Sequence, residues 1–212
     1  MKKIKNILTK GAIAASAILP ITQAEAQVSG NVEYIHSENT DRSFARANGF
    51  YGLPGNARGF SFVELYRNGD GYFGKSMITR DVVSGLRTKI EAIHSGEPLS
   101  RVGLGANFSV PGMPEGSFAN FGILPLWFGD GKVVGNRAQA QYAFGLSLPH
   151  GFNVGGFGEW NLLGENGVEW GYGETELTKR LGLIKFGYNM RLRNNGDASP
   201  IAEHGLVAGV NF

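Results

Sequence analysis

The chain has 212 residues, with 20 basic and 18 acidic side chains, 33 glycines, 11% aromatic residues and no cysteine. The absence of cysteine excludes disulfides, thiol catalysis and thiolate metal sites. The four histidines are scattered without the spacing of metal ligands, so we expect neither a metal nor a cofactor.

The first 26 residues have the three parts of a secretory signal peptide. A basic start, MKKIKNILTK, precedes the apolar run GAIAASAILPI, and Ala24-Glu25-Ala26 is a small-x-small cleavage signal. The run is too short and wrongly flanked to anchor the protein in a membrane. We therefore predict a signal peptide over 1–26 and a mature domain over 27–212.

Removal of the signal peptide changes the charge balance. It takes away four lysines and Glu25, which leaves 16 basic and 17 acidic residues and a net charge of −1 instead of +2. A protein that binds a nucleic-acid polymer needs a basic surface that neutralises phosphates. We expect no such partner.

Alternation with a period of two dominates the mature chain. In LIKFGYNMRLR (183–193) the apolar side chains share one face and the polar side chains share the other. The runs SRVGLGANFSV (100–110) and AQAQYAFGLSL (138–148) repeat this pattern. A helix would spread the polar residues over every face, so these segments are predicted to be strands.

Turn-like segments such as PGN, NGDG and GENG separate successive alternating runs. The resulting prediction is about twelve strands, and an even number returns both ends of a barrel to the same side of a membrane. The predicted strands are 27–37, 43–52, 58–67, 71–82, 85–95, 100–110, 117–128, 137–148, 152–163, 167–178, 183–193 and 203–212.

The alternation alone fits a soluble barrel with an apolar interior as well as a membrane barrel whose apolar face meets lipid. The signal peptide, the absent cysteine, the aromatic strand ends and the final Phe212 favour the membrane. We predict an all-β protein, a transmembrane antiparallel up-and-down β-barrel in the outer membrane of a Gram-negative cell. Outer-membrane lipids are then expected partners.

The last strand, EHGLVAGVNF (203–212), alternates to its final residue. It resembles the C-terminal recognition signal of bacterial outer-membrane barrels. The resemblance implies the barrel-assembly machinery as a partner that reads the strand ending at Phe212. We also expect this strand to pair with the first, so that no sheet edge meets lipid.

The middle of the chain resembles a family of channels. The runs GFSFVELYRNGDGYFGKSMI (59–78) and GLRTKIEAIHSG (85–96) look like the nucleoside-specific channel (Tsx-like) group of twelve-stranded barrels. That resemblance implies a narrow, monomeric diffusion channel for nucleosides or similar small solutes. Less closely, the chain resembles twelve-stranded channels for acidic sugars, so a channel for acidic mono- or oligosaccharides is the alternative.

The lumen-facing residues follow from the cost of charge in lipid. An Arg or Lys at the bilayer midplane costs about 2–4 kcal/mol on the outer face of a barrel. The charged face of strand 85–95 should therefore line the lumen, and the same argument places Glu33 and Lys75 there. The candidate lumen or solute-binding residues are Phe60, Phe62, Glu64, Tyr66, Arg87, Lys89, Glu91, Arg101, Glu159, Lys185 and Arg191.

Charges of both signs in one lumen predict either a polar selectivity ladder or a salt-bridged core that seals the barrel. Twelve strands make the interior wider than that of eight-stranded barrels, which side chains fill. Inward glycines such as Gly103 and Gly145 would leave further space. An open pore is the expectation, and a sealed structural barrel is a second alternative.

Three strands have ambiguous facing. Strand 58–67 presents either Phe60, Phe62, Glu64 and Tyr66 or the set around Val63 to the lumen. In strand 167–178 Glu169 and Glu174 cannot both face inward without a β-bulge, and Pro125 indicates a bulge or bend in strand 117–128.

An outer-membrane lipid hydrolase is a further alternative, since such barrels use a Ser and a His on the outer face. The sequence contains the pairs His36-Ser37 and His94-Ser95. Adjacent residues of a strand point to opposite faces, so neither pair forms a dyad by itself. We expect that the protein is not an enzyme and has no catalytic residues.

Overall fold

A computed structural model describes residues 28–40, 43–67, 71–95, 101–129, 132–133, 138–164, 167–194 and 201–212. The predicted signal peptide lies outside the described residues. In the described part of the chain no helix is long and apolar enough to cross a membrane.

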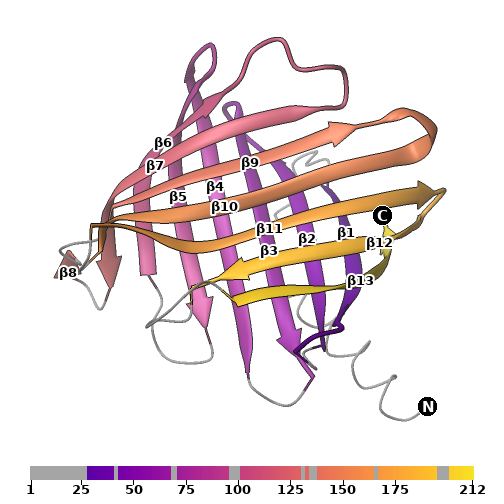
Figure 1. Ribbon diagram of the computed structural model, residues 1–212. Coiled ribbons are helices and arrows are strands. Elements are labelled where there is room, and N and C mark those ends of the chain that lie inside the picture. Colours follow the sequence, from indigo (N-terminus) through magenta and orange to yellow (C-terminus); the bar gives the residue numbers. More distant parts are fainter. Residues whose placement is uncertain are drawn as a thin grey trace.

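Twelve long strands and one two-residue strand make up the described structure (Figure 1). The two-residue strand β8 (Lys132–Val133), which was not predicted, pairs with β7, and a single 3-10 turn η1 spans Pro149–Gly151. The long strands are β1 (Val28–Ser37), β2 (Ser43–Leu53), β3 (Ala57–Tyr66), β4 (Tyr72–Val83), β5 (Leu86–Ser95), β6 (Arg101–Ser109), β7 (Phe118–Gly129), β9 (Gln139–Ser147), β10 (Phe152–Gly164), β11 (Gly167–Leu181), β12 (Ile184–Arg193) and β13 (Ile201–Asn211).

The strands close into an antiparallel up-and-down barrel, which confirms the predicted fold. Each long strand pairs with its neighbour along the chain, and β1 pairs with β13 to close the sheet. The seam continues to Phe212, whose backbone N–H and C=O exchange 3.0 Å hydrogen bonds with those of Gly30. All twelve predicted strands overlap an observed one, and β11 runs three residues further than expected.

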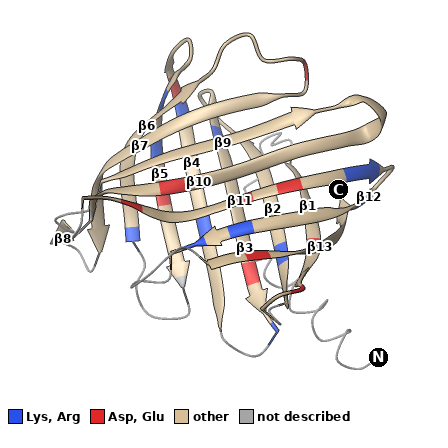
Figure 2. Cartoon of the chain, viewed as in Figure 1, with Lys and Arg blue, Asp and Glu red and all other residues tan. Residues whose placement is uncertain are grey.

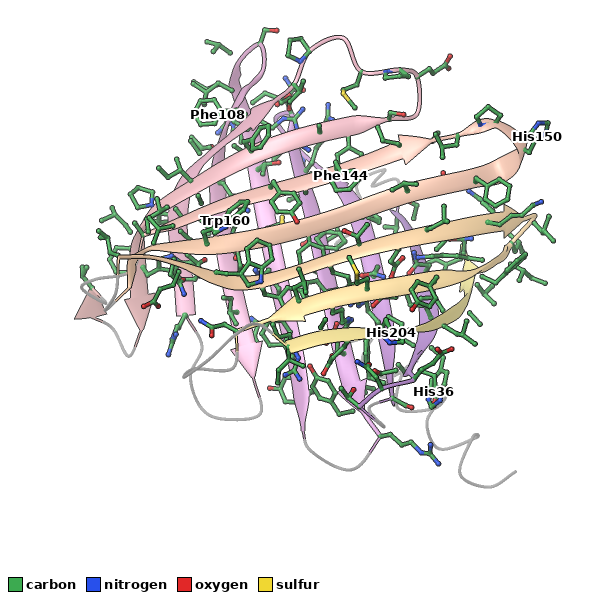
Figure 3. All side chains as sticks on the ribbon, viewed as in Figure 1. His36, Phe108, Phe144, His150, Trp160 and His204 are labelled. Atoms are coloured by element: carbon green, nitrogen blue, oxygen red, sulfur yellow. The ribbon has the colours of Figure 1, made fainter. Side chains whose placement is uncertain are left out.

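The two faces of the barrel differ in polarity. Large apolar side chains cover the outer face (Figure 3), among them the exposed Ile90, Phe121 and Phe186. Charged residues lie along the strands (Figure 2), and many of them, such as Arg46 and Glu91, are buried inside. A soluble barrel has the reverse arrangement. This barrel therefore belongs in a bilayer, and barrels of this kind span the outer membrane.

A β-bulge in β7 accommodates Pro125, as predicted. The register with β6 jumps from Leu104↔Leu126 to Ala106↔Ile123, so one extra residue of β7 lies opposite Gly105. Proline lacks the N–H that a regular ladder position would need, and the bulge removes that need.

A second bulge, in β11, resolves the conflict between Glu169 and Glu174. The register with β10 jumps from Glu159↔Tyr172 to Trp160↔Trp170, which leaves Gly171 unpaired. Tyr172 and Glu174 thus face the lumen, while beyond the bulge Glu169 shares the lumen face with its partner Asn161. The bulge reconciles the two registers that the sequence allowed.

Glycine and aromatic residues are paired across neighbouring strands. A Cβ built at Gly173 would lie 2.3 Å from the Trp170 ring, and one at Gly158 would lie 2.5 Å from Tyr142. These rings lie over the glycine backbone of the adjacent strand or of their own strand. Further pairs on the outer face are Gly59–Tyr51, Gly156–Phe144 and Gly30–Phe212. Inside the barrel, Trp127 covers Gly103 and Phe118 covers Gly145.

This pairing corrects the expectation of open space at Gly103 and Gly145, whereas at the inward Gly155 a Cβ would meet only the carbonyl oxygen of Phe144, at 3.5 Å. At Gly103 and Gly145 an inward aromatic ring occupies the volume that the missing side chain leaves. At Gly209 a Cβ would lie 2.7 Å from the carbonyl oxygen of Val32, so glycine there allows close approach of two strands. At Gly103, Gly145 and Gly209 glycine serves packing of the wall.

Deletion of Phe212 is expected to reduce the yield of folded barrel severalfold. The deletion removes both hydrogen bonds to Gly30 and the ring that covers it, at the seam where β1 meets β13. The measurement is the fraction of protein that migrates as a compact, heat-modifiable species after refolding into lipid. Phe212→Tyr keeps the ring and the backbone, and it should refold like the parent; equal yields for the deletion would contradict the prediction.

Candidate functional site: the lumen of the barrel

The register of β3 places its aromatic and acidic residues inside the barrel. Glu64 accepts hydrogen bonds from the buried Arg46 of β2, which fixes that face as the inner one. Phe60, Phe62 and Tyr66 follow on the same face at a spacing of two residues, and each lines a cavity of the lumen. The first of the two registers considered for this strand is therefore correct.

Arg46 is the centre of the largest group of charges in the lumen. Its Nη1 lies 2.5 Å from Glu174 Oε1 and 3.4 Å from Glu33 Oε1, and its Nη2 lies 2.6 Å from Glu64 Oε1. Glu176 is 3.6 Å away. A guanidinium presents five N–H donors in a fixed plane, which suits a position between several carboxylates.

Arg191 of β12 links the same carboxylates from another side. Its Nη2 lies 2.9 Å from both Glu64 Oε1 and Glu174 Oε2. The guanidinium carbon also stacks 3.9 Å above the ring of Phe44. Glu64 and Glu174 are thus held between two arginines, and together these groups join one wall of the barrel to the other.

Lys185 extends this group toward Phe212. Its Nζ lies 2.7 Å from Glu33 and 2.7 Å from Glu176. Asn189 donates to Glu174 and Glu176 at 2.8 and 3.1 Å. We call the whole set the arginine cluster: Glu33, Arg46, Glu64, Glu174, Glu176, Lys185, Asn189 and Arg191.

A second group, the lysine cluster, lies on β4, β5, β9 and β10. Lys75 Nζ lies 3.0 Å from Glu91 and 2.8 Å from Glu159, and Lys89 Nζ lies 2.9 Å from Glu91. Gln141 accepts a hydrogen bond from Lys89 and donates one of 3.1 Å to Glu91. Buried charges need such partners, because an unpaired charge in this environment is costly.

Two cavities occupy the lumen, one toward each end of the barrel. The small cavity, about 260 Å³, is lined by aromatic and charged residues that include Tyr66, Arg193 and Glu203. The large cavity, about 430 Å³, extends to Arg58 and Arg87, near the end of the barrel where β1 begins and β13 ends. We call these the Glu203 end and the Phe212 end.

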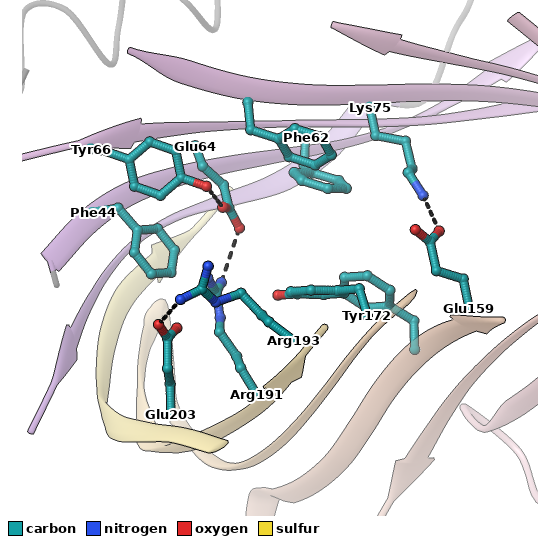
Figure 4. Close-up of a pocket in the computed structure, with 12 residues that line it drawn as sticks. Phe44, Phe62, Glu64, Tyr66, Lys75, Glu159, Tyr172, Arg191, Arg193 and Glu203 are labelled. Atoms are coloured by element: carbon teal, nitrogen blue, oxygen red, sulfur yellow. Dashed lines mark hydrogen bonds and ion pairs between the residues drawn. The ribbon is translucent and has the colours of Figure 1, made fainter. Parts of the chain in front are cut away.

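Four side chains are shared by the two cavities, and three of them, Phe62, Lys75 and Glu159, are labelled in Figure 4; we call the four the partition. Phe62, Lys75, Phe157 and Glu159 line both of them. The rings of Phe62 and Phe157 have centroids 6.2 Å apart, and the Lys75–Glu159 ion pair lies beside them. The arginine cluster lies between the cavities as well, since Arg46 and Glu174 line the large one and their partners Glu64 and Arg191 line the small one.

Ten of the eleven candidate residues line one or both cavities. Arg101 does not; it lies at the start of β6, at the Glu203 end. Arg87 lines the large cavity and pairs with Asp81 at 2.6 Å. The remaining nine are Phe60, Phe62, Glu64, Tyr66, Lys89, Glu91, Glu159, Lys185 and Arg191. Contact of these residues with a solute stays a prediction.

Several important lumen residues were not among the candidates. Arg46 lies on the inward face of β2, and the alternation Phe44-x-Arg46-x-Asn48 could have identified it. Glu174 and Tyr172 were ambiguous because of the bulge at Gly171.

The structure places His36 against a serine of the neighbouring strand. No group of three or more metal-ligating side chains comes together in the described residues. His36 and Ser37 do not contact each other; instead His36 Nδ1 lies 2.8 Å from Ser43 Oγ of β2. Ser43 is buried, so a lipid ester cannot reach its hydroxyl in this conformation.

Comparisons with known proteins support the fold of a porin. No protein-family model and no curated protein sequence matches the chain. Among solved structures, it is similar to the KdgM porin, with a TM-score of 0.56 and 8% identity over 87% of this chain and 98% of that one. It is also similar to the NanC porin, with a TM-score of 0.57 and 10% identity over 86% of this chain and 98% of that one. At this identity the likeness concerns the fold, and the resemblance to nucleoside-specific channels stays a prediction.

Proposed function

We propose that the protein is a narrow outer-membrane diffusion channel for small polar solutes. The observation that carries the proposal is the pair of cavities, one toward each end of a polar lumen, that share four lining side chains. A structural barrel has no need of two chambers aligned in this way. The porin-like fold supports the same function.

A nucleoside-like solute fits the aromatic lining. Phe62 lies at the partition and Phe60 next to it in the large cavity, and both rings can stack on a base or the apolar face of a sugar. Carboxylates and amides beside the rings, such as Glu159 and Asn48, supply acceptors and donors for hydroxyl groups. This chemistry suits an uncharged ring with polar substituents.

An acidic mono- or oligosaccharide is the second candidate, because of the basic mouth at the Phe212 end. Arg58 lines the large cavity and has no ion pair within the described part of the chain. Arg87 lines the same cavity. Two guanidinium groups near one opening attract anions and form bidentate bonds with a carboxylate.

Single-channel conductance of the refolded mature protein in a planar bilayer tests the proposal. A small, stable conductance is expected, and titration with a nucleoside, a neutral disaccharide and an acidic disaccharide identifies the solute class by block of the current. A heat-modifiable, folded barrel without conductance would contradict the channel and support a sealed structural barrel.

Two substitutions distinguish the solute classes. Phe62→Ala should weaken block by a nucleoside about 5- to 150-fold, which corresponds to the 1–3 kcal/mol of one base-stacking contact. Arg58→Ala should leave nucleoside block unchanged and weaken block by the acidic disaccharide. If Phe62→Ala instead weakened block by the acidic disaccharide and Arg58→Ala weakened block by the nucleoside, the aromatic residues would bind the acidic sugar and the basic residues would bind the nucleoside.

A further inference from the structure

The Lys75–Glu159 ion pair crosses the lumen between the two cavities. Lys75 belongs to β4 and Glu159 to β10, and β5, β6, β7 and β9 lie between these strands along the shorter way around the sheet. The two side chains therefore reach from opposite walls and meet at 2.8 Å between Nζ and Oε2 (Figure 4). Both residues border both cavities.

This ion pair has fewer constraints than the arginine cluster. Arg46 contacts four carboxylates, whereas Glu159 has Lys75 as its sole ion-pair partner in the described residues. The Glu159 side chain is also 18% exposed, compared with 2% for Glu174. Separation of Lys75 from Glu159 thus breaks one contact, and rearrangement of Arg46 breaks several.

Lys75 keeps a partner after it leaves Glu159. Its Nζ also lies 3.0 Å from Glu91, which is buried and further held by Lys89 and Gln141. The lysine can therefore move toward the β5 wall without becoming an unpaired buried charge, which would be costly. Glu159, which faces the cavities, then becomes free to bind water or a solute.

We propose that the Lys75–Glu159 ion pair, together with the rings of Phe62 and Phe157, is the gate and charge filter of the channel. This inference rests on the proposed function. A passing solute replaces the ion pair by offering an acceptor to Lys75 and a donor to Glu159 at the same time. Polyhydroxylated and zwitterionic solutes can do both. A simple anion is repelled by Glu159, and a simple cation is repelled by Lys75.

Neutralisation of the two residues provides the test. Lys75→Met and Glu159→Gln should each raise single-channel conductance at least about twofold, because the bridge is lost. Their ion selectivities should shift in opposite directions: toward cations for Lys75→Met and toward anions for Glu159→Gln. The double variant should conduct as well as either single variant, with the selectivity of the parent. Asp81→Asn breaks an ion pair at the mouth and leaves the Lys75–Glu159 pair intact, so it is the control and should not produce the twofold rise in conductance.

Cysteine accessibility gives a readout that is independent of conductance. The chain has no cysteine, so single thiols introduced at Thr79 in the large cavity and Phe73 in the small cavity are unambiguous. A charged thiol reagent added from the Phe212 end should modify Thr79→Cys in every background. It should modify Phe73→Cys rapidly only when Lys75→Met and Glu159→Gln are also present.

The outcomes of these experiments test the gate and the channel as two separate proposals. If the parent conducts and the variants match it in conductance and selectivity, the gate is wrong and the channel stands. If the parent is silent and the double variant conducts, the gate is correct and free diffusion through the parent is wrong. If parent and variants are all silent although folded, and Phe73→Cys stays unmodified, both proposals are overturned.

Discussion

Replacement of Arg46 by methionine is expected to lower the free energy of unfolding by about 3–5 kcal/mol, the usual cost of removing one partner of a buried ion pair. Arg46 is buried and pairs with Glu33, Glu64 and Glu174. Methionine fills much of the same volume but leaves these carboxylates facing one another with less positive charge between them. Urea unfolding in lipid vesicles, followed by tryptophan fluorescence, measures the change.

Arg87→Met is the matched control for this prediction. Arg87 also forms an ion pair, with Asp81 at 2.6 Å, but 21% and 38% of these side chains are exposed. Exposed ion pairs contribute about 0–1 kcal/mol, so the control should unfold almost like the parent. Equal unfolding midpoints for the two variants would show that the arginine cluster does not stabilise the barrel.

Gly105→Ala is expected to destabilise the barrel by about 1–3 kcal/mol, the range found when atoms are forced into a packed site. Gly105 lies opposite the bulge of β7, and a Cβ at this position would lie 1.9 Å from the carbonyl oxygen of Ile123. That oxygen belongs to the backbone, so relief of the clash requires movement of a whole strand. The same urea titration tests the prediction.

Gly122→Ala controls for the loss of a glycine in the same pair of strands. A Cβ at Gly122 would have its nearest neighbour at 3.4 Å, which is ordinary contact. This variant should match the parent or gain slightly, since alanine restricts the unfolded chain. A Gly105→Ala protein as stable as Gly122→Ala would mean that the bulge relaxes freely.

The strands and most of their facing could be predicted from the sequence, because both depend on local rules. Alternation with a period of two identifies a strand, and the cost of charge in lipid turns side chains such as Lys89 and Lys185 inward. These rules need no knowledge of which strands face each other across the lumen.

The pairing of charges across the lumen could not be predicted in the same way. Arg46 meets Glu174 over 128 positions of sequence, and the contact depends on the tilt of the strands and on the bulge at Gly171. Arg46 was not among the predicted lumen residues because the outward face of its strand carries small residues, Ala45 and Ala47. The contrast between an apolar and a polar face is therefore weak in this strand. The division of the lumen into two cavities likewise depends on Phe157. Its contact with Phe62 on a distant strand cannot be read from the sequence.

The long reach of the lumen ion pairs has a consequence for assembly of the barrel. Lys185 meets Glu33 over 152 positions, and Lys75 meets Glu159 over 84. On an incomplete sheet each lysine has a partner on the neighbouring strand, Glu91 for Lys75 and Glu176 for Lys185, but Glu33 and Glu159 lack these lysines. Closure of the barrel therefore adds the contacts across the lumen to pairs already formed between neighbouring strands, and these long-range contacts favour cooperative and slow assembly, as expected for a topology of high contact order.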